Sequence, residues 1–350
     1  MITQKTQING KHILLTGGSG FLGRAIIAEM LNETSPLKIQ ELTVYDLKPL
    51  EGISEDRVIY SKGDVRDADR LKEVCRGMDA VIHTAAIVDW GNRSEAEIME
   101  VNFGGTKNVI EACRFNGVKA MLYTSSLDVL FDGRELVDVD EDTPYPEKHS
   151  SYYCTTKYLA EKRVLESNSD ILKTCALRPA DIFGEGDPFH IGSLIGMAKG
   201  GFYIRLGDGK TKSQHVYVRN IAYAHVLAAK ALLEGNKKVA GNPYFVTDSP
   251  GSNFFTFFDH IVLEAGYRIW PGNLWLPRRF AYVIGSISEF IALILRPIIK
   301  YTPKMSRFAV LYTCTNYTFN AERAKADFGF VPKYNREEAM ERTVGFYRKT

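Results

Sequence analysis

Two side chains four residues apart, Tyr153 and Lys157, are the strongest candidates for chemistry in this sequence. The pattern around them predicts a helix over 150–167, so both side chains project from one helical face. A phenol with a pKa of about 10 is a weak base at neutral pH, and a nearby ammonium group stabilises its anion. The pair therefore suits proton removal from an alcohol. The same spacing also occurs by chance on solvated helices, so it needs support from elsewhere in the chain.

A glycine-rich segment near the N-terminus gives that support. It lies between a predicted strand at 12–16 and a predicted helix at 21–31. A pyrophosphate needs a tight turn, close approach of the backbone and free amides at a helix N-terminus, and such a loop supplies all three. The segment therefore predicts a dinucleotide-binding loop. The loop residues expected at the cofactor are Gly17, Gly20, Phe21, Leu22 and Gly23.

Two acids follow the next predicted strands. Asp46 comes 23 residues after Gly23, where a carboxylate accepts hydrogen bonds from the adenosine ribose and repels a 2′-phosphate. It predicts NAD rather than NADP, although Lys48 weakens the argument slightly. Asp64, followed by Val65, falls where an adenine ring would lie, and a helix-capping role suits Asp64 equally well.

The elements that must position these residues alternate along the first half of the chain. Short apolar runs alternate with amphipathic stretches, which predicts a doubly wound α/β fold with a parallel sheet covered on both faces. We expect residues 1–180 to form the nucleotide-binding core and residues 181–350 mainly a smaller substrate lobe, with about 210–248 returning to the core. Strands are predicted at 12–16, 41–46, 57–60, 80–83, 120–124 and 174–178, and helices at 21–31, 67–76, 94–116 and 150–167. The run Thr124-Ser-Ser126 ends the fifth strand, at the sheet edge where α/β proteins bind ligands.

Composition sets the limits of these interpretations. The chain has 350 residues, 45% of them apolar, which excludes a disordered or collagen-like protein. Its 44 basic and 42 acidic side chains give a net charge of +2, which disfavours a nucleic-acid partner. Five scattered cysteines without a Cys-x-x-Cys pair predict a reducing compartment and no metal site. The polar N-terminus lacks a secretory signal, so we expect an intracellular protein.

Several runs resemble the extended short-chain dehydrogenase/reductases. They are the glycine loop, Tyr123-Thr-Ser-Ser126, Tyr153-Cys-Thr-Thr-Lys157 and Arg178-Pro-Ala-Asp-Ile-Phe-Gly-Glu-Gly186. The C-terminal half narrows the resemblance to the 3β-hydroxysteroid dehydrogenase family, which includes the sterol-4α-carboxylate 3-dehydrogenases. The runs that carry this narrower match are Tyr244-Phe-Val-Thr-Asp-Ser249, Leu276-Pro277, Leu295-Arg-Pro297, Phe319-Asn-Ala-Glu-Arg-Ala324 and Glu337-Glu-Ala-Met-Glu-Arg-Thr343.

The resemblance implies roles for individual residues. Tyr153 would take the proton of a 3β-hydroxyl, Lys157 would lower the pKa of Tyr153 and touch the ribose, and Ser126 would hydrogen-bond the reacting oxygen. A hydride would pass from carbon 3 of a steroid or sterol to NAD. Ser125 would be held in backbone packing. Further cofactor contacts are expected at Val65, Ala85 and Pro179.

Other activities stay open at this point. Relatives that also shift a ring double bond are thought to use paired acids after the late strand, where this chain has Asp248 but Ser249, so isomerase activity is in doubt. A decarboxylating sterol-4α-carboxylate 3-dehydrogenase, a nucleotide-sugar epimerase or dehydratase, and a non-catalytic NAD-binding scaffold are the alternatives. The aromatic-rich region 252–310 argues against a sugar substrate, and the intact Ser/Tyr/Lys set argues against a scaffold.

The segment 280–299 predicts an amphipathic helix with two possible uses. Small and polar residues fall on one narrow face and the rest is apolar, so the helix could cover a sterol pocket or lie in a membrane surface. The charge distribution bears on this choice, because residues 1–150 carry a net −8 and residues 151–350 a net +10. Within 278–307, six basic residues accompany only Glu289. This indicates a peripheral membrane surface as a partner. A homodimer also stays open.

Overall fold

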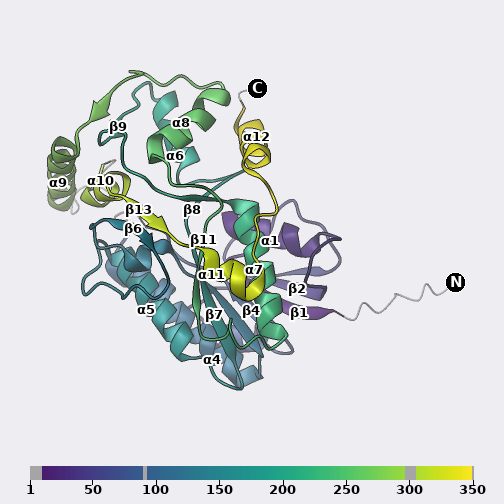
Figure 1. Ribbon diagram of the computed structural model, residues 1–350. Coiled ribbons are helices and arrows are strands. Elements are labelled where there is room, and N and C mark those ends of the chain that lie inside the picture. Colours follow the sequence, from purple (N-terminus) through teal and green to yellow (C-terminus); the bar gives the residue numbers. More distant parts are fainter. Residues whose placement is uncertain (1–9, 90–92, 296–304, 349–350) are drawn as a thin grey trace.

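A seven-stranded parallel sheet forms the centre of the molecule in a computed structural model that describes residues 10–89, 93–295 and 305–348 (Figure 1). The strand order is β11-β7-β5-β4-β1-β2-β3. This arrangement confirms the predicted doubly wound α/β fold. The strands are β1 (Lys11–Thr16), β2 (Ile39–Asp46), β3 (Val58–Lys62), β4 (Ala80–His83), β5 (Ala120–Thr124), β7 (Lys173–Pro179) and β11 (Pro243–Val246).

Helices cover both faces of this sheet, as its apolar strands require. Alternate residues of β1 point to opposite sides, so Ile13 and Leu15 belong to one hydrophobic cluster and Leu14 to another. The first cluster includes α1 (Phe21–Leu31) and α7 (Val218–Leu233), which pack against each other. The helices whose residues join Leu14 are α2 (Ala68–Val74), α4 (Thr106–Asn116) and α5 (Tyr152–Glu166).

The predicted helix at 94–116 is interrupted. It consists of α3 (Glu95–Met99), a π-helical turn (Glu100–Gly105) and α4. Gly105 is the last residue of the π-helical turn and packs against Val65. A Cβ on this glycine would lie 2.5 Å from Val65 Cγ2. The absence of a side chain on Gly105 thus lets the π-helical turn pack closely against Val65, which follows β3.

The sheet order places a switch point between β1 and β4. The chain passes from β1 to β2 on one side, and β4 then pairs with the other edge of β1. Connections leave the carboxyl ends of these two strands in opposite directions, which opens a crevice there. The predicted phosphate loop and Ala85 both lie at this crevice.

The second half of the chain builds a smaller lobe with an aromatic core of its own, in which Phe254, Phe257 and Phe258 pack together. It contributes β11 to the main sheet beside β7, so the chain crosses back after residue 180. The division into domains at that residue stays a prediction. The remaining elements are the 3₁₀ helix Leu127–Leu130, β6 (Leu136–Val139), β8 (Asp181–Phe183), α6 (Ile191–Lys199), β9 (Arg205–Leu206), β10 (His215–Tyr217), α8 (Phe254–Glu264), β12 (Trp275–Leu276), α9 (Arg278–Leu295), α10 (Arg307–Thr313), β13 (Tyr317–Phe319), α11 (Glu322–Phe328) and α12 (Arg336–Tyr347).

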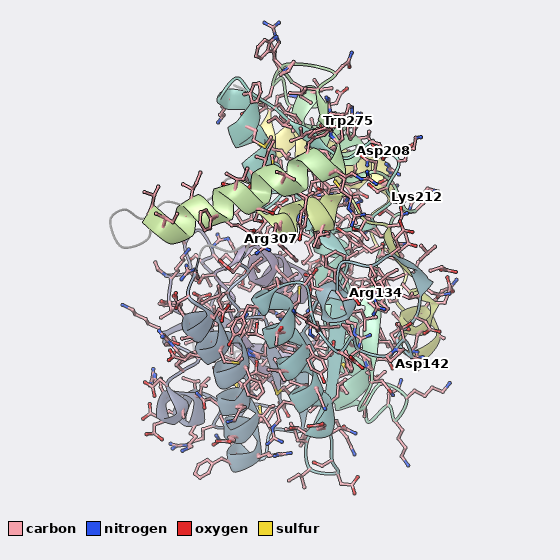
Figure 2. All side chains as sticks on the ribbon, turned by 90° about the vertical axis from the view of Figure 1, so that its left-hand side faces the viewer. Arg134, Asp142, Asp208, Lys212, Trp275 and Arg307 are labelled. Atoms are coloured by element: carbon pink, nitrogen blue, oxygen red, sulfur yellow. The ribbon has the colours of Figure 1, made fainter. Side chains whose placement is uncertain are left out.

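Helix α9 lies along the outside of this lobe, above Arg307 in Figure 2. Its small-residue face turns inward, because a Cβ on Gly285 would lie 3.1 Å from Arg307 N, and Glu289 accepts hydrogen bonds from Arg307 N (2.7 Å) and Nε (2.6 Å). Its apolar face is exposed, with Ile287 at 54% and Phe290 at 62%. The end of the predicted segment, 296–299, lies outside the described residues. Across the described ranges, no helix is long and apolar enough to cross a membrane.

Candidate active site

The glycine loop leaves β1 and enters α1 with its backbone closely packed. Gly17 has φ +74°, and a Cβ there would lie 2.7 Å from Ala85 N. A Cβ on Gly23 would lie 2.3 Å from Gly17 O, so only glycine fits. Gly20 precedes α1 without a side-chain cap, which leaves the first helical amides directed to the crevice. The loop therefore fits the pyrophosphate of a dinucleotide.

Asp46 is the last residue of β2 and lines the crevice beside the glycine loop. Its carboxylate accepts hydrogen bonds from Ser19 N (3.0 Å) and Lys48 N (2.9 Å), which fixes it beside the glycine loop. It also lines the cavity, and its contact with a ribose stays a prediction. The backbone N–H of Lys48 thus helps to orient the Asp46 carboxylate.

Asp64 and Val65 line the same cavity after β3. Arg66 donates to the Asp64 carboxylate (2.6 Å), and this hydrogen bond holds the pKa of Asp64 below its usual value. The cap of α2 is Asp67, which accepts from Arg70 N (3.0 Å). The helix-capping interpretation of Asp64 is therefore wrong, because the chain makes one more turn before the helix begins.

Residues after β4 and β7 also line the cavity. Ala85 and Pro179 are among them, and their contact with a cofactor stays a prediction. Asn102, by contrast, is buried and holds the backbone of Ile87 through two hydrogen bonds of 2.7 and 3.0 Å. His83 is a packed strand residue between Thr16 and Thr106, and burial lowers its pKa to about 3.

Tyr153 and Lys157 lie on the cavity side of α5. Lys157 Nζ donates to Thr124 O (2.6 Å), and burial lowers the pKa of this lysine to about 7 against the opposing charges of Glu161 and Asp128. Burial also raises the pKa of Tyr153 well above its ordinary value, and the charge of Asp128 adds to the effect. In the protein alone, Tyr153 is therefore a neutral phenol.

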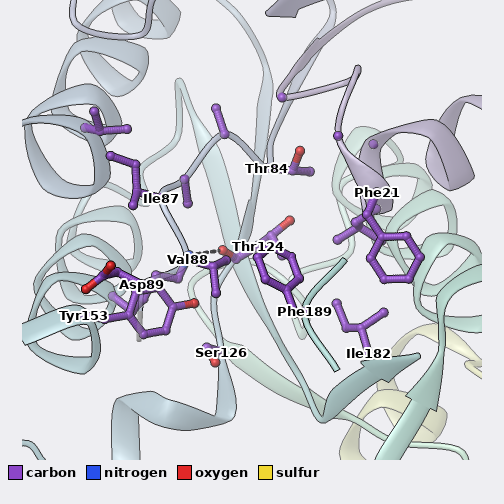
Figure 3. Close-up of a pocket in the computed structure, with 18 of the residues that line it drawn as sticks. Phe21, Thr84, Ile87, Val88, Asp89, Thr124, Ser126, Tyr153, Ile182 and Phe189 are labelled. Atoms are coloured by element: carbon purple, nitrogen blue, oxygen red, sulfur yellow. Dashed lines mark hydrogen bonds between the residues drawn. The ribbon is translucent and has the colours of Figure 1, made fainter. Parts of the chain in front are cut away.

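Ser126 ends the extended segment after β5 and completes the predicted set. Its hydroxyl donates to Asp128 Oδ2 (2.7 Å). Ser125 is held by the main chain, where its N–H donates to Leu177 O (2.7 Å). Figure 3 shows Tyr153 and Ser126 on one side of the cavity and Phe21 on the other.

The two predicted groups of residues face one cavity of about 730 Å³. The glycine loop and Asp46 line it together with Ser126, Tyr153 and Lys157. Apolar side chains also line it, among them Leu127, Ile182, Pro188, Phe189 and Phe308. One cavity thus combines a dinucleotide-binding loop, a phenol with an ammonium group on the same helix, and apolar wall residues.

A cluster of buried ionisable groups in the cavity wall was missed in the sequence. Asp181 accepts a hydrogen bond from Tyr312, and His190 Nε2 lies 3.9 Å from Asp181 Oδ1. Burial opposes a proton on His190, but the hydrogen bond and charge of Asp187 raise its pKa to about 9. Burial raises the pKa of Asp128 to about 7. Two of these acids carried a sequence signal: Asp128 follows Ser126 by two residues, and Asp181 lies in the run that begins at Arg178.

Asp248 and Ser249, the two positions considered for isomerase activity, lie outside the main cavity. Asp248 accepts hydrogen bonds from Tyr217 N (2.9 Å) and Asn220 Nδ2 (2.6 Å), and Ser249 Oγ donates to His215 O (2.9 Å). Both residues line a separate hollow of about 430 Å³. They therefore do not add an acid–base pair to the main cavity. In the described ranges, no cluster of histidine, cysteine or acidic residues could hold a metal ion.

Comparison with known proteins identifies the family to which this chain belongs. Residues 14–276 match the model of the 3-beta hydroxysteroid dehydrogenase/isomerase family. The chain is 34% identical to mouse 3 beta-hydroxysteroid dehydrogenase type 7 (95% of this chain, 94% of the relative) and 34% identical to the decarboxylating sterol-4-alpha-carboxylate 3-dehydrogenase of Schizosaccharomyces pombe (95% and 96%). A crystal structure of dTDP-glucose 4,6-dehydratase from Streptomyces venezuelae shares the fold, with a TM-score of 0.77 at 19% identity over 96% of this chain and 97% of that one. The chain belongs to the 3-beta hydroxysteroid dehydrogenase/isomerase family and is a dehydrogenase-type oxidoreductase.

Proposed function

We propose that the protein oxidises the 3β-hydroxyl group of a steroid or sterol to a 3-ketone with NAD. One observation carries the proposal: Tyr153 and Ser126 line the same cavity as the glycine loop and a set of apolar side chains. NAD, when bound, accepts the hydride from carbon 3. Tyr153 takes the hydroxyl proton, and Lys157 favours the loss of the phenol proton through its positive charge. Ser126 completes the hydrogen-bonded group around the reacting oxygen.

The test is NADH formation with a panel of alcohols. Wild-type protein is expected to oxidise 3β-hydroxysteroids and to leave UDP-glucose unchanged. Tyr153→Phe is expected to lower the rate by at least about 1000-fold, because no other side chain replaces the phenol oxygen, while NADH binding followed by fluorescence is retained. A variant that keeps most of the wild-type rate would refute the role of Tyr153, and oxidation of UDP-glucose alone would refute the substrate class.

A decarboxylating reaction on a 4α-carboxysterol is the second candidate. The fission yeast relative is named for this activity, and His190, whose pKa the neighbouring Asp187 raises to about 9, lines the same cavity. Release of CO₂ together with NADH from a 4α-carboxysterol would support it. NADH formation confined to substrates without a carboxylate would exclude it.

We also propose that α9 rests on an anionic membrane surface. Its apolar face, which includes Ile287 and Phe290, is exposed, and α9 contributes no described residue to the cavity wall. Basic residues flank the helix, as a surface-lying amphipathic segment requires. The helix is thus better suited to a lipid surface than to a pocket lid.

Vesicle sedimentation tests this placement with phosphatidylcholine/phosphatidylserine vesicles. The double variant Ile287→Glu/Phe290→Glu is expected to reduce binding by at least about tenfold, since two exposed apolar side chains are lost. Phe115→Glu is the matched control, because Phe115 is 72% exposed on α4, far from the basic segment in sequence. Equal loss in both variants, or no binding by the wild type, would contradict the proposal. Charge reversal at Arg278 and Arg279 measures the electrostatic share of binding.

A further inference from the structure

The ammonium group of Lys157 is held by a backbone carbonyl at the end of β5. Lys157 Nζ donates to Thr124 O over 2.6 Å and lies 4.4 Å from the centroid of the Tyr123 ring. Lys157 is only 2% exposed, so its side chain has little room to move. The place of the ammonium group therefore depends on the place of the Thr124 carbonyl.

The Thr124 carbonyl can accept from a side chain because β4 ends beside it. Strands β4 and β5 pair only as far as His83 and Tyr123. Beyond that pair, the N–H of Ala85 donates to the Thr16 hydroxyl over 3.4 Å instead of continuing the ladder to β5. The oxygen of Thr124 is thus left for another donor.

The peptide that carries this oxygen is anchored on its other side by β7. Ser125 N, which belongs to the same peptide unit, donates to Leu177 O over 2.7 Å. The C=O and N–H of a trans peptide point in opposite directions. The bond to β7 therefore directs Thr124 O away from β7 and toward Lys157.

The side chain of Thr124 is anchored by a histidine of α7, which covers the opposite face of the sheet from α5. Thr124 Oγ1 lies 2.8 Å from His225 Nε2, and His225 Nδ1 lies 2.7 Å from Ile221 O. A carbonyl oxygen only accepts, so Nδ1 carries the ring hydrogen. Burial lowers the pKa of His225 to about 4, so near pH 7 the ring is neutral and Nε2 accepts from Thr124.

His225 itself lies outside the site. It is completely buried, and among the described residues it does not line the main cavity, whereas Thr124 does. Of its two hydrogen bonds in the described part of the chain, one stays within α7 and the other leads to Thr124. A specific effect of His225 on the reaction therefore has to pass through Thr124.

We propose that His225 is a positioning residue for the oxidation, which fixes Thr124 so that its carbonyl holds the Lys157 ammonium group beside the Tyr123 ring. His225 neither gains nor loses a proton in the reaction. One of the three N–H groups of Lys157 is used by Thr124 O, and two remain for other partners. The kinetic consequence rests on the proposed function, whereas the placement of Lys157 can be measured without a substrate.

The first experiment follows the Lys157 side chain by NMR in protein labelled with [ε-¹³C]lysine. The signal that is lost in Lys157→Met identifies this residue, and the Tyr123 ring is expected to shift its Hε protons upfield. His225→Leu removes both ring nitrogens, so the upfield shift is expected to decrease or disappear. A folded His225→Leu that keeps the wild-type signal would overturn the proposal.

The second experiment measures steady-state oxidation of a 3β-hydroxysteroid with NAD. His225→Leu and Thr124→Val, which each remove the hydrogen bond between the two residues, are expected to lower kcat about tenfold, with the KM for steroid within about twofold. Thr124→Ser keeps the hydroxyl and is expected to retain at least about half of the wild-type kcat. Equal losses in Thr124→Val and Thr124→Ser, or an unchanged kcat in His225→Leu, would overturn the role of this hydrogen bond.

Two comparisons separate this role from a general loss of stability. In a Lys157→Met background, His225→Leu is expected to change the remaining kcat by less than about twofold, because the group that it positions is gone. A further tenfold loss there would show that His225 acts independently of Lys157 and would overturn the proposal.

The matched control is Thr174→Val, near the start of β7. It removes another fully buried threonine hydroxyl of the same sheet, which donates to Val164 O over 2.8 Å. This variant is expected to keep the wild-type kcat and the Lys157 signal. The same losses in Thr174→Val would mean that any buried threonine bond suffices, which also overturns the proposal.

Failure of the proposed function is distinguishable from failure of this inference. A wild type that oxidises no 3β-hydroxysteroid refutes the proposed substrate, and the NMR comparison still decides the role of His225. Thermal unfolding shows whether His225→Leu folds. Where it does not, Thr124→Val makes the same comparison from the other partner of the bond, with a side chain of similar shape.

Discussion

The two ends of the cavity, the cofactor end at the glycine loop and Asp46 and the substrate end around Asp128 and Asp181, are built in different ways. The glycine loop and Asp46 follow strands β1 and β2, and local turns fix their positions. The substrate end brings together Asp128, Asp181 and Tyr312, which lie far apart in sequence and meet only in the folded lobe. Local geometry governs the first end and tertiary packing governs the second. Substitutions should therefore affect the two ends separately.

The largest effect is expected at the cofactor end. In Gly23→Val, the new side chain would overlap Gly17 O, so the loop cannot close, and we expect NADH to bind at least about 100-fold more weakly in a fluorescence titration. Gly20→Ala is a graded control, because its Cβ would lie 3.2 Å from Gly17 O and the loop need shift only slightly. Equal losses in the two variants would mean that the loop is not closely packed.

A smaller effect is expected at the substrate end. Phe189→Ala removes an apolar wall residue that is 36% exposed, so the fold should be unaffected, and we expect the KM for steroid to rise about tenfold with NADH binding unchanged. Phe202→Ala is the control, since Phe202 is 52% exposed and does not line the cavity. Steady-state kinetics with both variants would measure whether only the KM for steroid changes. Weaker NADH binding by Phe189→Ala would contradict the independence of the two ends.

The smallest effect is expected at Asp46. Asp46→Asn removes the negative charge that disfavours a 2′-phosphate but retains an oxygen that can accept hydrogen bonds. We expect the ratio of kcat/KM for NAD to that for NADP to fall about fivefold, with little change for the steroid. A preference for NADP in the wild type would contradict the sequence interpretation of Asp46.

The same contrast explains what could be predicted from the sequence. Strand and helix positions in the first half follow from apolar periodicity, and helix α1 begins and ends where it was expected. The glycine loop and the spacing of Tyr153 and Lys157 are local patterns, so their positions in the cavity could be anticipated. Asp181 and His190 carry no such pattern, because their place depends on tertiary contacts, such as the pairing of β8 with β10 and the hydrogen bond from Tyr312 to Asp181. The inward turn of the small-residue face of α9 likewise depends on its contact with α10.

The pairing of β13 with β6 has a consequence for the order of events during synthesis. Strand β6 follows the segment that carries Ser126 and Asp128, and its partner, Tyr317–Phe319, emerges about 180 residues later. Phe131, beside this segment, packs against Tyr312 and Tyr317 from the same late stretch. The growing chain thus carries its phosphate loop long before the wall behind Ser126 can close. A protein released before residue 317 would contain every described residue that lines the cavity but would lack Tyr317, which packs against Phe131 behind it.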